Sequence, residues 1–113
     1  QEAQPRGGQA RAEGQVAERQ RAVIWTPGAR TDLDEIVAYI ARDSLPSALA
    51  FLEEAFETAE TLVTLSERGR VVPELNDPIV RELFIKRYRL LYEIHEHEIH
   101  VLTVLHGARE FKP

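Results

Sequence analysis

The chain has 113 residues, a formal net charge of −5 and no cysteine. This length fits a single domain, and the lack of cysteine excludes disulfides and thiol chemistry. No apolar run approaches the roughly 20 residues that a membrane span needs, and no signal-peptide core is present, so we expect a cytoplasmic protein that does not enter membranes.

The first 22 residues differ in composition from the rest of the chain. Between Gln1 and Arg21, Val16 is the only sizeable apolar residue. Such a segment buries too little apolar surface to offset the entropy lost on ordering. We therefore expect residues 1–22 to be a disordered N-terminal extension, or a remnant of expression or of an upstream reading frame, with a partner-binding arm as the alternative. The folded domain is expected at residues 23–113.

A short strand is expected at residues 23–25, followed at once by a helix. Thr26 is a suitable helix cap, and Pro27 suits the first helical position because no amide hydrogen is needed there. The apolar face repeats at helical spacing, and its members are Leu33, Ile36, Val37 and Ile40. This helix should end near residues 43–44.

A second helix is expected to be capped by Ser44 and opened by Pro46. Its main apolar stripe is expected to comprise Leu49, Leu52, Phe56, Ala59 and Val63, broadened by Ala48, Phe51, Ala55 and Leu62. Gly69 ends this region, and prolines and Asn-Asp indicate a loop at residues 71–78.

Three β-rich runs complete the chain, at residues 80–85, 88–94 and 99–105. The middle run alternates between apolar and other residues, which predicts a strand with one apolar face. The polar residues 95–98 are short enough for a hairpin connection. The side chains expected to cover the helices are Leu83, Ile85, Tyr88, Leu90, Tyr92, Ile94, Ile99, Val101, Thr103 and Leu105. The sequence thus predicts an α+β domain, with the N-terminal strand and an αα-hairpin packed on a mostly antiparallel sheet.

Arg109 is the most promising binding residue, because the last strand delivers it to the sheet edge beside His106. Its planar guanidinium is suited to gripping a carboxylate or a phosphate. Arg89 lies within a strand, so it either contacts a partner or pairs with Glu82 or Glu93 inside the fold. Both interpretations remain open.

The histidines do not predict a metal site. His95, His97 and His100 are close in sequence, but zinc needs three or four convergent ligands and the chain has no cysteine. No phosphate-binding loop, nucleophile elbow or paired-carboxylate motif is visible either. We therefore expect neither a metal nor a cofactor.

An ordered series of short motifs resembles the RelE/ParE superfamily of bacterial toxins. The segments at residues 88–92, 99–102 and 104–109 are similar to its C-terminal half, and those at residues 24–27, 32–36 and 39–41 to the first strand and helix of the ParE branch. The resemblance implies a RelE/ParE-like fold and the toxin of a type II toxin–antitoxin module. It also implies a gyrase inhibitor that binds DNA gyrase and is neutralised by a cognate antitoxin, ParD-like or other.

The expected contacts follow from this resemblance and from charge. Arg109, His106 and Arg89 are expected to meet the target, and acidic residues of the antitoxin are expected to pair with Arg81, Arg87 or Arg89.

The alternative is a RelE-like endoribonuclease that uses Arg89, Arg109 and His106. However, the paired lysines of that branch are missing from residues 80–83, and so is its tyrosine after the Arg109 position. From Val23 onward, 10 basic residues stand against 16 acidic ones, whereas RNA binding depends on phosphate contacts. A gyrase inhibitor that is not an enzyme is therefore favoured, without sequence-specific nucleic-acid binding; an inactive toxin-derived binding module is a third possibility.

Overall fold

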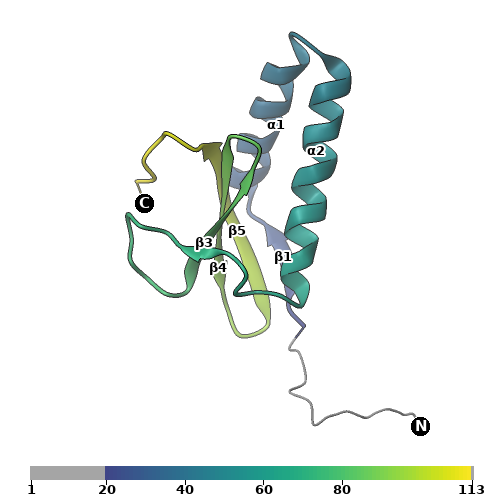
Figure 1. Ribbon diagram of the computed structural model, residues 1–113. Coiled ribbons are helices and arrows are strands. Elements are labelled where there is room, and N and C mark those ends of the chain that lie inside the picture. Colours follow the sequence, from purple (N-terminus) through teal and green to yellow (C-terminus); the bar gives the residue numbers. More distant parts are fainter. Residues whose placement is uncertain (1–19, 113) are drawn as a thin grey trace, which may run out of the picture.

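A computed structural model describes residues 20–112, which form two helices packed on one sheet (Figure 1). The elements are β1 (Ala22–Trp25), α1 (Pro27–Ala41), α2 (Leu45–Glu60), a 3₁₀ turn (Thr61–Val63), β2 (Arg70–Val71), β3 (Val80–Ile85), β4 (Tyr88–Ile94) and β5 (Glu98–His106). The strand order is β1-β5-β4-β3-β2. Only β1 runs parallel to its neighbour, β5, and the other pairs are antiparallel. The predicted α+β architecture is confirmed.

The N-terminal expectation concerns mainly residues 1–19, which lie outside the described residues. β1 begins at Ala22, one residue earlier than expected. The backbone N–H of Arg21 donates to Val63 O at 2.9 Å. Within residues 20–112, no helix is both long and apolar enough to cross a bilayer.

Both predicted helix caps are confirmed. The Thr26 hydroxyl accepts a hydrogen bond from the Ala29 N–H at 3.1 Å and donates to Val101 O at 2.8 Å, so it also fastens α1 to β5. The Ser44 hydroxyl accepts from the Ser47 N–H at 3.2 Å. These side chains satisfy amide groups that the first turn of a helix leaves without partners.

The apolar face of α2 is rotated relative to the main stripe expected from sequence. Its buried residues are Ala48, Phe51, Ala55 and Ala59. Leu49 is 55% exposed and Phe56 is 37% exposed. The expectation for Leu49 and Phe56 was wrong because the buried face of α2 follows Ala48, Phe51 and Ala55, which were expected only to broaden the stripe. Phe56 instead packs edge to face against Trp25, with ring centroids 5.2 Å apart.

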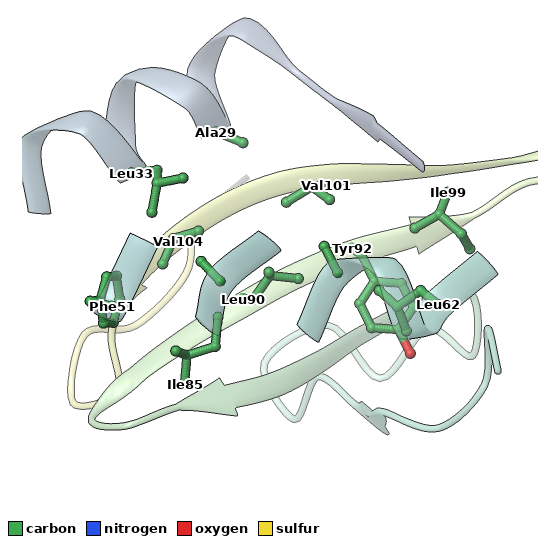
Figure 2. Packing of buried hydrophobic residues seen from close by; sticks show 12 residues of the cluster. Ala29, Leu33, Phe51, Leu62, Ile85, Leu90, Tyr92, Ile99, Val101 and Val104 are labelled. Carbon is green, nitrogen blue, oxygen red and sulfur yellow. The ribbon is translucent and has the colours of Figure 1, made fainter. Parts of the chain in front are cut away.

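The main core lies between the helices and the sheet (Figure 2). Ala29 and Leu33 point from α1 toward Val101 and Val104 of β5. Tyr92 of β4 is fully buried. Its hydroxyl donates to Ser66 O at 2.7 Å and accepts from the Gly69 N–H at 3.0 Å, so the buried polar atom is satisfied.

A β-bulge in β5 inverts the expected alternation of its second half. Leu91 pairs with Thr103 whereas Tyr92 pairs with Val101, which makes Leu102 the extra residue. Beyond it Val104 joins the main core, while Leu105 joins a second apolar cluster. The inward orientation expected for Leu105 was therefore wrong, because an extra residue reverses the two-residue period. The Thr103 hydroxyl donates to the Asp32 carboxylate of α1, so Thr103 still contacts a helix.

The second apolar cluster covers the face of the sheet that points away from the helices. Its buried members are Val72, Val80, Leu91 and Leu105, and Phe111 packs against them. The segment between β2 and β3 and the C-terminal segment lie on this side (Figure 1). Val71 was expected in a loop but pairs with Arg81 as part of β2. Both faces of the sheet are therefore covered.

Candidate functional site

A groove runs between α1 and the end of β5 with the C-terminal segment. One part has a volume of about 570 Å³ and is lined by residues that include Asp32, Arg109 and Lys112. An adjoining hollow of about 190 Å³ shares Asp32 and Arg109 and adds His106 and Tyr39. The groove is therefore acidic on the α1 side, and its C-terminal side carries Arg109 and Lys112 together with Glu110.

The bulge at Leu102 brings His106 to this groove. His106 lies opposite Tyr88 in the ladder, and the two rings meet edge to face with centroids 5.6 Å apart. With strict alternation from Val101, His106 would have pointed to the other face of the sheet. Its Nδ1 accepts from the Ala108 N–H at 3.2 Å, so Nε2 carries the hydrogen and can act as a donor.

Arg109 lies in the turn that follows β5, and its side chain is exposed. Within residues 20–112 its guanidinium has no hydrogen bond or ion pair. The turn lies against the β3–β4 connection, because the Gly107 N–H donates to Arg87 O at 2.7 Å. A Cβ on Gly107 would be 2.9 Å from that oxygen, so glycine is needed for the close approach. Arg109 is thus a cation on a fixed turn, unpaired within the part of the chain that the structure describes.

Arg89 is buried at the centre of an ion network on the far face of the sheet. Its Nε donates to Glu82 at 2.7 Å, and its two terminal nitrogens each donate to Glu74 at 2.9 Å. One of them also donates to Arg109 O at 2.7 Å. The second carboxylate oxygen of Glu82 is held by Arg70. The geometry therefore favours the structural interpretation of Arg89, with Glu82 and not Glu93 as its strand partner.

This network fixes the segment that carries Arg109. The hydrogen bonds from Arg89 lower the pKa of Glu74 from 4.5 to about 2, and the Phe111 N–H adds a further hydrogen bond at 3.0 Å. The two carboxylates in turn raise the pKa of Arg89, with the hydrogen bond to Glu74 as the largest cause. The sequence analysis assigned no role to Glu74, because no sequence pattern predicts that a carboxylate in a loop pairs with Arg89, 15 positions away.

Arg81 and Arg87, the other two arginines expected to pair with the antitoxin, differ in whether their side chains already have partners. Arg81 uses its guanidinium on backbone carbonyls, with bonds of 2.9 Å to Pro78 O and 3.1 Å to Gly69 O. Arg87 is exposed at the β3–β4 turn, and its side chain has no partner within the described part of the chain. Arg87 is therefore the better placed of the two for an incoming acidic group.

The histidines of the β4–β5 hairpin do not all point the same way. His95 and His100 have ring centroids 4.1 Å apart, and Glu93 joins them. The side chain of His97 is 79% exposed and is 3.9 Å from Glu96. The sequence grouped three histidines here, whereas the fold brings together two of them with a carboxylate.

Comparison with known proteins gives a family match and a fold match. The family described as "ParE toxin of type II toxin-antitoxin system, parDE" matches residues 23–111. A solved chain described as "Chromosomal ParDE TA system from P. aeruginosa" is similar in fold, with a TM-score of 0.63 and 23% sequence identity. The alignment covers 77% of this chain and 96% of that one. No curated protein gave a significant match.

Proposed function

This chain belongs to the family of ParE toxins of type II toxin–antitoxin systems, and from that premise we propose that it inhibits DNA gyrase by binding to it. We further propose that a cognate antitoxin neutralises it. On this proposal the chain is a cytoplasmic binding protein rather than an enzyme, and it needs no cofactor.

The observation that carries the proposal is the guanidinium of Arg109, which has no partner among residues 20–112 and lies in the groove beside His106. Five N–H donors in a planar fork recognise a carboxylate or phosphate in two places at once. Because the turn is held by Gly107 and by the bond from Arg89 to Arg109 O, little flexibility of the backbone is lost on binding. Arg89 then acts as a positioning residue, and Arg109 and His106 make the contact.

The ribonuclease alternative receives less support from the same geometry. A nuclease of this kind needs several cations around the scissile phosphate. Four of the five donors of Arg89 are already bonded to Glu82, Glu74 and Arg109 O, and its exposed fraction is 4%. Within the described residues, the groove thus offers Arg109, His106 and Lys112, beside an acidic rim from α1.

The antitoxin is proposed to bind as a segment that folds on contact. Leu45 and Leu49 lie one turn apart on α2 and are 60% and 55% exposed, and Tyr39 of α1 is 62% exposed. Exposed apolar side chains of this size favour coverage by a partner. Acidic side chains of the antitoxin would pair with Arg87, whereas Arg81 and Arg89 would first have to break existing hydrogen bonds.

A supercoiling assay with purified gyrase tests the proposed target. The wild-type chain should inhibit supercoiling, and Arg109→Ala should weaken inhibition by at least about tenfold, since a lost charged hydrogen bond costs roughly 1.5–3 kcal/mol. Arg68→Ala is the matched control, because Arg68 is also an exposed arginine but lies outside the groove. If the wild-type chain leaves supercoiling unaffected and cleaves messenger RNA on translating ribosomes, the endoribonuclease alternative is favoured over gyrase inhibition.

A further inference from the structure

Three side chains that the proposed function does not use gather at the β4–β5 hairpin. Glu93 and His100 face each other directly in the ladder. His95 comes directly after β4, and its ring lies against the Glu93 carboxylate. The neighbouring pair, Ile94 and Ile99, packs into the main core. The cluster therefore lies on the face away from the helices, at the opposite end of the sheet from the turn after β5 (Figure 1).

The three side chains are close enough to share one ion. His95 Nε2 is 2.7 Å from a carboxylate oxygen of Glu93. One ligand atom from each of Glu93, His95 and His100 lies within 4.8 Å of the other two. A tetrahedral zinc ion with bonds of about 2.0–2.2 Å sets its ligand atoms roughly 3.4 Å apart. Small rotations about the side-chain torsions therefore suffice to bring all three onto one centre.

The backbone beneath the cluster is well fixed. The His95 N–H donates to Glu98 O at 2.8 Å and closes the hairpin. Arg21 holds the same turn from outside, because its Nε donates to His95 O at 2.7 Å. Ligands on neighbouring, hydrogen-bonded strands lose less entropy on binding an ion than ligands on a free loop would lose.

From this geometry we propose that Glu93, His95 and His100 bind a divalent transition-metal ion, with Zn²⁺ as the best fit. Two imidazoles and one carboxylate form a known zinc ligand set, whereas Mg²⁺ and Ca²⁺ prefer oxygen ligands alone. The side chains are 31%, 42% and 32% exposed, so an ion can enter and water can take the fourth position. Glu98 lies 2.8 Å from His100 Nε2 and orients that ring, as carboxylates commonly do around metal-bound histidines.

Zinc titration of the untagged chain by calorimetry, with thermal denaturation as a second readout, tests the site. One Zn²⁺ should bind per chain, and Zn²⁺ at about 100 times its dissociation constant should raise the melting temperature by roughly 10–20 °C. His95→Ala, His100→Ala and Glu93→Gln should each weaken binding by more than about 100-fold, and Glu98→Gln by roughly 10–100-fold. Mg²⁺ should not replace Zn²⁺.

His97→Ala is the control, because His97 lies on the same hairpin but outside the cluster. It should bind Zn²⁺ as the wild type does. All variants should keep the wild-type melting temperature in EDTA within a few degrees, since partly exposed side chains contribute little to stability. The proposal fails if the wild type shows no saturable one-to-one binding, or if His97→Ala loses as much affinity as His100→Ala; the three side chains then form only a hydrogen-bonded cluster.

Discussion

Replacing Arg89 with alanine separates its structural role from a direct role at the binding surface. Arg89 joins Glu82 of β3, Glu74 of the β2–β3 connection and the backbone of Arg109. A residue that serves only a partner would leave stability almost unchanged, within about 0.5 kcal/mol. A residue that holds three segments together should destabilise the fold when it is removed.

The expected loss follows from the groups that Arg89 would leave behind. The Glu82 side chain is fully buried and, among residues 20–112, would keep Arg70 as its one charged partner, whose own side chain is 62% exposed. Breaking a buried ion pair by removing one partner costs about 3–5 kcal/mol. For a domain of this size, that loss should lower the melting temperature by more than about 12 °C. This is a large part of a total stability of roughly 5–15 kcal/mol.

Urea denaturation followed by circular dichroism measures this loss directly. Arg87→Ala is the matched control, since Arg87 is an exposed arginine two residues away whose side chain has no partner within residues 20–112. Its free energy of unfolding should match the wild type within about 0.5 kcal/mol. If Arg89→Ala is as stable as Arg87→Ala, the ion network does not hold the C-terminal segment, and Arg89 returns to the set of candidate contact residues.

Three further outcomes are expected. Arg109→Lys should keep the wild-type melting temperature within a degree or two but should inhibit growth only partly, because lysine lacks the planar fork. A fully toxic Arg109→Lys variant would count against recognition of the target by the guanidinium in the groove. Gly107→Ala should lose roughly 1–3 kcal/mol in urea denaturation, since its Cβ would be 2.9 Å from Arg87 O; an unchanged midpoint would contradict that contact. Glu74 titrates at about 2 in the folded chain instead of 4.5, so its contribution is complete above pH 4.5 and is lost as the pH falls toward 2. The difference in free energy of unfolding between wild type and Glu74→Gln should shrink as the pH falls from 4.5 to 2. A difference that stays constant would refute the lowered pKa of Glu74.

The sequence by itself determined both helices, the longer strands and most of their ends, but not β2. Thr26 and Ser44 cap their helices as expected, and β3 and β4 occupy residues 80–85 and 88–94 as expected. These features depend on neighbours within a few residues: a cap bonds an amide three positions on, and alternation repeats every second residue. The ordered motifs between residues 24 and 109 were likewise sufficient to indicate the ParE family, whose model matches residues 23–111.

Tertiary structure alone decided which faces and partners these elements use. The bulge at Leu102 turned His106 into the groove, and the fold brought Glu74 to Arg89 across 15 positions and His100 to Glu93 across two strands. Local pattern carries no information on such contacts, because each depends on strand register and on chain segments that meet only after folding. Arg109 was expected from sequence at the sheet edge beside His106, whereas the network that holds its backbone in place depends on contacts between distant segments.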